Sequence, residues 1–139
     1  MLNLPKEEIL ALTIYGEARG EPVEAQIAVG CVIRNRVSAD KGYNEVCLEP
    51  KQFSCWNDFD PNYPILTGLA DKMTTHVFIP EPILKQCLYI SFGIINGAIL
   101  DNTFGSKNYM TTSLYESKIV HWANEMKPSV VYGKQIFLV

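Results

Sequence analysis

Apolar side chains recur at helical spacing along the first predicted helix, residues 5–19. Leu10, Thr13 and Ile14 stand at i, i+3 and i+4, and Glu17 continues this mostly apolar face at i+7. A glycine follows closely, which suits a left-handed cap at the helix end. The pattern therefore predicts that Glu17 lies at the last turn with its carboxyl against the core, where a partly dehydrated acid is suited to proton transfer.

Further helices and one strand are predicted in the rest of the chain. Residues 22–37 are apolar almost all round, which is typical of a helix in the middle of a core. Residues 82–97 repeat apolar positions at helical spacing and end on Asn-Gly, while residues 65–76 are only weakly helical. The closing segment, residues 133–139, reads as a strand. These elements predict three core helices in one compact unit.

The long segment of residues 38–64 is rich in Gly, Asn, Asp and Pro. These residues favour turns, so we expect an irregular path with a short extended piece around Val46. Near the other end of the chain, we expect a helical turn through Trp122. Long irregular segments in small domains often carry function. The segment of residues 38–64 is therefore a candidate part of the functional site.

Composition narrows the class of protein. The chain is 47% hydrophobic and 19% charged, as expected for a globular domain, and its formal net charge is −3. There is no basic stripe for nucleic acid and no polybasic patch for a membrane surface. No apolar run approaches the roughly 18 residues of a membrane span. The N-terminus shows no secretory pattern, so we expect synthesis in the cytoplasm without a signal peptide.

The cysteines and histidines indicate no metal site and no cofactor. No Cys-x-x-Cys pair occurs, and His76 and His121 stand alone in the sequence. We expect reduced, structural thiols, with two of them on the core faces of helices, while a bridge between the middle two stays an alternative. The four cysteines are Cys31, Cys47, Cys55 and Cys87.

Several motifs occur together in a recognisable order. Tyr-Gly-Glu-Ala-Arg-Gly-Glu at 15–21, Asn-Arg-Val at 35–37 and Gln-Phe-Ser-Cys-Trp at 52–56 precede Asp-x-Thr-x-Gly-x-x-x-Tyr at 101–109. Over most of its length the chain resembles the SleB-like cell-wall hydrolases, which include spore-cortex lytic enzymes and phage endolysins. The resemblance implies an α+β, predominantly α, lysozyme-like fold in a single domain, residues 1–139. It also implies that Glu17 is the single catalytic glutamate.

One feature departs from the resemblance. Relatives commonly have a Thr-His-Tyr-like run before a later active-site tyrosine, whereas this chain has Lys107-Asn108-Tyr109. Asn108 and Tyr109 are nevertheless candidate substrate-binding residues. Tyr109 could hold the Glu17 carboxyl by a hydrogen bond or support a developing positive charge, and its alternative role is that of an ordinary core tyrosine.

The resemblance implies cleavage of the β-1,4 bond between N-acetylmuramic acid and N-acetylglucosamine in peptidoglycan. A hydrolase needs a second carboxylate beside the acid, whereas a lytic transglycosylase needs only one and leaves 1,6-anhydro ends. Glu24 and Asp101 are the candidate second carboxylates. Each has a structural alternative, because Glu24 suits the first turn of a helix and Asp101 suits a turn cap. The alternative for Glu17 is a surface carboxylate near Arg19, or a helix-end acid paired with Arg34 or Arg36.

A glycan groove needs aromatic rings beside amides and hydroxyls, because sugars present apolar faces and peripheral hydroxyls. Gln52, Ser54 and Trp56 supply this mixture within five residues. Phe53 and Cys55 alternate with them and are expected to face the core. The alternative for Trp56 is a buried side chain that anchors the loop.

Two other classes of protein are alternatives to a glycosidic-bond-cleaving enzyme of this kind. A metal hydrolase would need paired histidines with acids close by, which the sequence lacks. A non-catalytic glycan-binding or virion structural protein would keep the fold without the activity. We expect a monomer whose partner is the glycan strand of peptidoglycan. It would reach the cell wall by phage-type release or by later export.

Overall fold

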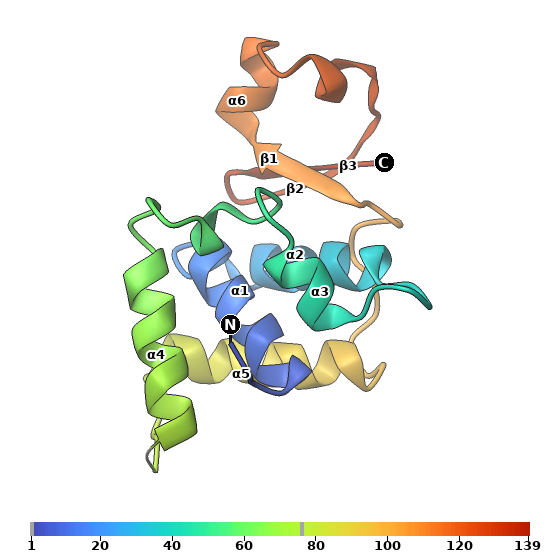
Figure 1. The fold of residues 1–139 in the computed structure, drawn as a ribbon. Coiled ribbons are helices and arrows are strands. Elements are labelled where there is room, and N and C mark those ends of the chain that lie inside the picture. The colour runs from blue at the N-terminus through green and yellow to red at the C-terminus, as the bar shows by residue number, and fades with distance from the viewer. Residues whose placement is uncertain (1, 76) are drawn as a thin grey trace.

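Three helices form the centre of the protein in the computed structural model, which describes residues 2–75 and 77–139. They are α1 (Lys6–Ala18), α2 (Val23–Arg36) and α5 (Pro82–Ile95), and they pack against one another. Figure 1 shows them together in the lower body of the molecule. The three core helices predicted from the apolar pattern are confirmed. None of the described helices is both long and apolar enough to cross a bilayer.

The segment after α2 is more helical than its composition predicted. It contains α3 (Tyr43–Leu48), the 3-10 turn η1 (Ser54–Trp56) and α4 (Tyr63–Thr75). The extended piece expected around Val46 is wrong, because Val46 lies in α3 with its side chain buried. Glu45 accepts a hydrogen bond from the Gly42 N–H, so local capping and core burial outweigh the strand preference of valine. The weakly helical segment predicted over residues 65–76 corresponds to α4, and its predicted end, residue 76, lies outside the described residues.

A small antiparallel sheet follows the helices. Its strands are β1 (Asn108–Thr111), β2 (Pro128–Tyr132) and β3 (Gln135–Leu138), in the order β1-β3-β2. The predicted closing strand is confirmed as β3, whereas β1 and β2 were not predicted. The short helix α6 (Thr112–Ser117) and the 3-10 turn η2 (His121–Glu125) lie above the sheet in Figure 1, and η2 confirms the expected turn through Trp122.

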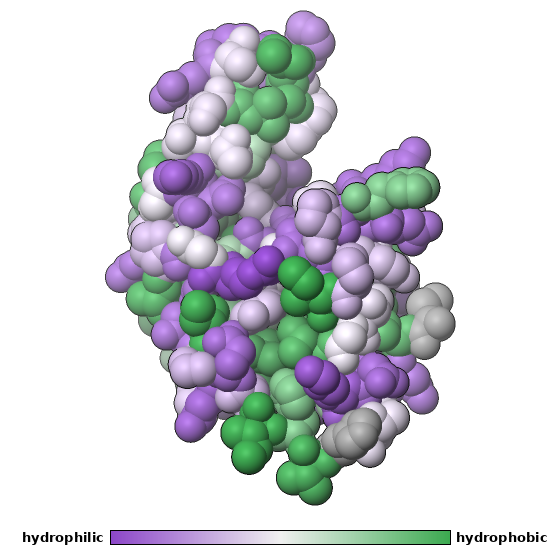
Figure 2. All heavy atoms as spheres, turned by 90° about the vertical axis from the view of Figure 1, so that its left-hand side faces the viewer, coloured by the Kyte–Doolittle hydropathy of each residue, from purple (hydrophilic) through white to green (hydrophobic). Residues whose placement is uncertain are grey.

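The sheet places β1 above the end of α1. Tyr109 in β1 stacks at 5.5 Å, between ring centroids, on Phe137 of β3. Phe137 is fully buried and belongs to the same core as α1, α2 and α5. Figure 2 shows the surface hollowed between the part of the molecule at the top, which contains α6, and the helical body below. One face of the sheet therefore joins the core of the helical body through Phe137. The other face belongs to a separate small cluster of Met110, Ala123, Ile136 and Leu138.

All four cysteines are buried thiols. Cys31 lies in α2 and Cys87 in α5, as the helical pattern predicted, and both side chains are completely buried. Burial raises the pKa of Cys47 and of Cys87 to about 12. The cysteines therefore act as small apolar side chains in the core.

Gly16 allows η1 to approach α1 closely. A Cβ atom at Gly16 would lie 2.7 Å from Cys55 Cβ and 2.8 Å from Leu66 Cδ1. Cys55 and Leu66 are both fully buried, so neither can move aside without disturbing the core. The missing side chain at residue 16 therefore sets the distance between η1 and the last turn of α1.

The variant Gly16→Ala should lower the free energy of unfolding by about 1–3 kcal/mol, because the added methyl overpacks the contact with η1. Gly68→Ala is the matched control, since Gly68 lies within α4 and a Cβ there would meet nothing within 4 Å. That variant should gain about 0.5–1 kcal/mol from helix propensity. Urea unfolding measures both values, and equal shifts in the two variants would contradict this account of the α1–η1 contact.

Candidate active site

The carboxylate of Glu17 lies at the last turn of α1, half-buried, as the sequence predicted. Its Oε2 accepts hydrogen bonds from the Cys55 backbone N–H at 3.1 Å and from the Ser54 hydroxyl at 3.3 Å. Its Oε1 accepts a hydrogen bond of 2.5 Å from the Tyr109 hydroxyl. Three donors from two distant segments therefore fix both oxygens of one carboxylate.

Tyr109 supports Glu17 from the other side of the site. Burial, and then the negative charge of Glu17, raise the pKa of the Tyr109 hydroxyl well above its usual range. The hydroxyl therefore keeps its proton at neutral pH. A phenol can donate to a carboxylate and can also accept from a carboxylic acid, so Tyr109 can hold Glu17 in both protonation states.

Glu17 opens into a cavity of about 370 Å³, here called the Glu17 cavity. Its walls come from α1, the end of α2, the segment around η1, β1 and α6. Three of the predicted substrate-binding residues line it: Gln52, Ser54 and Tyr109. The structure thus brings Gln52 and Tyr109, which are 57 residues apart in the sequence, to one site with Glu17.

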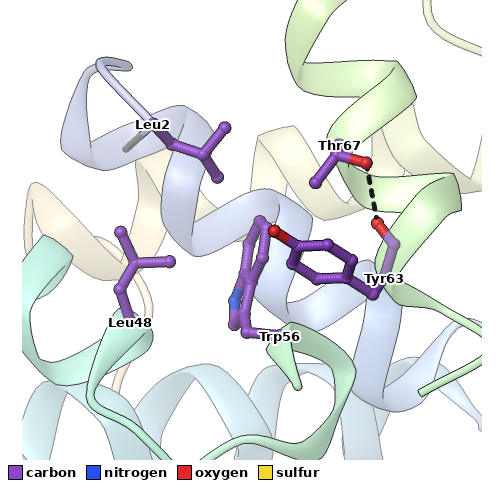
Figure 3. Close-up of a pocket in the computed structure, with 5 residues that line it drawn as sticks. All are labelled: Leu2, Leu48, Trp56, Tyr63 and Thr67. Carbon is purple, nitrogen blue, oxygen red and sulfur yellow. Dashed lines mark hydrogen bonds between the residues drawn. The ribbon is translucent and has the colours of Figure 1, made fainter. Parts of the chain in front are cut away.

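Trp56 does not line the Glu17 cavity. It lines a neighbouring cavity of about 260 Å³, where Figure 3 shows its indole between Leu48 and Tyr63. The indole N–H donates a 2.9 Å hydrogen bond to the Thr13 hydroxyl, one helical turn before Glu17. This geometry corresponds to the alternative considered for Trp56, an aromatic anchor that fastens η1 to α1. Phe53 and Cys55, on either side of Ser54, are buried in the core, as predicted.

Asn108 also lies outside the Glu17 cavity, although it is the neighbour of Tyr109. It lines a third cavity of about 320 Å³, together with Arg36 and Gln52. Adjacent residues of a strand point to opposite faces, which separates Asn108 from Tyr109. Asn108 and Tyr109 therefore line different cavities, and the role of Asn108 in substrate binding stays a prediction.

Neither candidate for a second carboxylate lines the Glu17 cavity. Glu24 is exposed in the first turn of α2. Asp101 accepts hydrogen bonds from Thr103 and Gly105 in its own turn and from Asn35, and these bonds lower its pKa. Both acids thus have the structural roles considered as alternatives. Among the described residues that line the cavity, Glu17 is the only acid.

The arginines considered as ion-pair partners of Glu17 bind elsewhere. Arg34 donates to the carbonyls of Ile94 and Ile99, and Arg19 donates to the carbonyl of Tyr15. Within residues 2–75 and 77–139, the one salt bridge joins Lys41 and Glu49. Glu17 is therefore held by neutral donors alone.

Sequence reasoning missed part of the cavity wall. Arg36, Lys51, Asn62 and Gln135 line it and were not predicted as binding residues. Arg36 was considered only as an ion-pair partner, and β1 and β3 had to be placed before Gln135 could be assigned. The part of the chain that the structure describes contains no group of three or more His, Cys, Asp or Glu side chains able to hold a metal ion.

The chain belongs to the cell wall hydrolase family, whose model matches residues 20–138. Two spore cortex-lytic enzymes are similar in sequence. The enzyme of Oceanobacillus iheyensis is 41% identical over 73 residues, 48% of this chain and 26% of that enzyme. The enzyme of Bacillus subtilis is 43% identical over 53 residues, 36% of this chain and 17% of that enzyme. The aligned parts thus span about a quarter or less of the length of these relatives.

Two solved structures have a similar fold. The catalytic domain of the Bacillus cereus SleB protein superposes with a TM-score of 0.65 and 26% identity, covering 96% of this chain and 89% of that one. The catalytic domain of the germination-specific lytic transglycosylase SleB from Bacillus anthracis gives 0.64 and 27%, covering 96% and 93%. These matches confirm the predicted α+β, predominantly α, SleB-like fold. Glu17 lies just before the span of the family model, so its assignment depends on the geometry of the site.

The variant Glu17→Gln should lower the pKa of Tyr109, because it removes the negative charge beside the phenol, while burial keeps that pKa above the ordinary value of about 10. Carbon-13 NMR of labelled tyrosine rings follows the titration. In the wild-type protein, the contribution of Tyr109 to the free energy of unfolding is fully present below pH of about 10. It is lost as the pH rises towards the folded-state pKa. Glu21→Gln is the control, since Glu21 binds the Lys134 N–H instead. An unchanged Tyr109 titration in Glu17→Gln would contradict the coupling.

Proposed function

We propose that this chain is a peptidoglycan lytic transglycosylase that cleaves the β-1,4 bond between N-acetylmuramic acid and N-acetylglucosamine. Glu17 is the general acid and then the general base, and the product carries a 1,6-anhydro muramic end. Membership of the cell wall hydrolase family and the similarity to a SleB catalytic domain described as a lytic transglycosylase support this activity. The substrate is the glycan strand of peptidoglycan.

The observation that carries the proposal is the single carboxylate of the Glu17 cavity. Hydrolysis of a glycosidic bond uses two carboxylates about 5–9 Å apart, one as the acid and the other as nucleophile or base. No other acid lines this cavity among the described residues. Asp101 accepts hydrogen bonds from the Thr103 and Gly105 backbone N–H groups of its own turn. Transglycosylation suits the site because its nucleophile is a hydroxyl of the sugar itself, which the same glutamate can deprotonate.

In the proposed reaction, Glu17 first donates one proton and then accepts one proton. Glu17 gives its proton to the glycosidic oxygen as the bond from that oxygen to the muramic acid C1 breaks. The Glu17 carboxylate then accepts the proton of the C6 hydroxyl as that oxygen forms a bond to C1. Because the hydroxyl belongs to the same sugar, held geometry gives it an effective concentration far above that of a solute, which favours it over water.

The donors around Glu17 fit this sequence of steps. The Cys55 N–H and the Ser54 hydroxyl hold Oε2, so the carboxyl plane keeps one orientation during the reaction. Tyr109 holds Oε1 in the resting structure and can change from donor to acceptor when Glu17 is protonated. These three groups are therefore positioning groups for the one acid–base residue.

We also infer that the chain works as a monomer at the cell wall. Glu17, its three donors and the walls of its cavity all belong to one chain, so the site needs no residue from a second copy. The wall is the place where the proposed substrate lies.

The variant Glu17→Gln keeps the shape of the side chain but cannot transfer a proton, so the rate on purified peptidoglycan should fall about 100- to 10,000-fold. Tyr109→Phe loses the hydrogen bond to a charged group and should cost about tenfold or more in kcat. Release of soluble fragments from a peptidoglycan suspension measures both, with circular dichroism to confirm folding.

Glu24→Gln is the matched control and should keep the wild-type rate, because Glu24 is outside the cavity. Full activity of folded Glu17→Gln would overturn the role of Glu17. A wild-type protein that binds peptidoglycan but releases no fragments would instead be a non-catalytic glycan-binding protein.

A further inference from the structure

A second cavity, here called the side cavity, adjoins the Glu17 cavity. Its volume is about 320 Å³, and it shares Arg36 and Gln52 with the Glu17 cavity as a common wall. Strand β1 also separates the two, since Tyr109 lines one cavity and Asn108 lines the other. The two cavities therefore lie next to each other, so a group attached to a sugar in the Glu17 cavity would lie near the side cavity.

The side cavity is rich in positive charge, although the chain as a whole carries −3. Arg36, Lys41 and Lys107 line it, and Glu49 is the one acid among its described lining residues. Lys41 and Glu49 form a salt bridge with each other. Arg36 and Lys107 are thus left without an acidic partner in the part of the chain that the structure describes.

The half-buried guanidinium of Arg36 keeps unused donors. Its Nε donates to the Lys107 carbonyl at 2.7 Å and its Nη1 donates to Gln52 Oε1 at 3.2 Å. A guanidinium has five N–H groups, so three remain without an acceptor among the described residues. One face of the guanidinium lies over the Phe53 ring, 5.1 Å from the ring centroid. Burial lowers the pKa of Arg36, against smaller opposing contributions from Tyr109 and Glu49. A carboxylate can accept two parallel hydrogen bonds from such a group.

We propose that the side cavity binds a carboxylate of the peptide that muramic acid carries in peptidoglycan, with Arg36 and Lys107 as its ligands. The choice of this ligand rests on the proposed function. Hydroxyl and acetamide groups of the sugars are neutral, whereas the peptide is joined to the muramic acid ring beside the cleaved bond and bears free carboxylates. The site would therefore select strands that carry peptides and would fix which sugar lies next to Glu17.

Binding of a soluble fragment tests the proposal without turnover. The probe is N-acetylglucosaminyl-N-acetylmuramoyl-tetrapeptide, and the comparison probe is the same fragment with its carboxyls converted to neutral amides. Both are titrated into the Glu17→Gln variant and followed by NMR. The carboxylate probe should bind about tenfold more tightly, as expected for charge-assisted hydrogen bonds. Added salt should reduce the difference by screening.

Three further substitutions in the same background locate the site. Lys107→Gln and Arg36→Gln should each reduce the preference for the carboxylate probe by about threefold or more. Lys107 is exposed, so its replacement leaves the core untouched. Lys72→Gln, an exposed residue of α4 with the same change in charge, is the control and should keep the preference.

Equal affinity for the two probes would overturn the proposal. So would a preference that survives both Lys107→Gln and Arg36→Gln. Because Glu17→Gln binds without cleaving, these results do not depend on activity. Failure of the proposed function would show separately, as a wild-type protein that releases no fragments from peptidoglycan.

Discussion

The hydrogen bonds that hold the Glu17 carboxylate are the constraint on which the site depends. Glu17 stands at the end of α1, the Cys55 N–H and Ser54 hydroxyl come from η1, and Tyr109 comes from β1, 92 residues further along the chain. The sheet must therefore dock on the helical body before the acid is fully held. Much of the fold outside the three core helices serves to bring η1 and β1 to this one side chain.

Two contacts set the position of η1 against α1. Gly16 lets the Cys55 side chain come within a distance that any larger residue would prevent. The Trp56 indole N–H binds the Thr13 hydroxyl, which in turn donates to the Ile9 carbonyl within α1. Buried hydrogen bonds of this kind are costly to break, so they fix the register of the turn. The three motif residues that suggested a sugar-binding surface thus have different places: Ser54 holds the Glu17 carboxylate, Trp56 anchors η1, and Gln52 lines the Glu17 cavity.

Local sequence patterns predicted the parts of the structure that depend on local physics. The apolar spacing predicted α1, α2 and α5, and the spacing within α1 placed Glu17 at a helix end against the core, because helical periodicity is a property of neighbouring residues. The pattern failed for Val46, where capping of α3 overrode strand preference. It also failed for β1 and β2, which are defined by their pairing with β3, a contact between segments distant in sequence. Arg36 was not predicted to line the cavity because its place there depends on where β1 docks, and no local pattern encodes a docking position.

In the proposed mechanism, one carboxylate is sufficient because the muramic acid C6 hydroxyl replaces water as the nucleophile. Mass spectrometry of the soluble fragments released from purified peptidoglycan by the wild-type protein tests this claim most directly. We expect muropeptides that are lighter than the hydrated products by one water molecule and that resist borohydride reduction, as 1,6-anhydro ends do. Fragments with reducible muramic acid ends would contradict this mechanism and would require a second catalytic carboxylate beside Glu17.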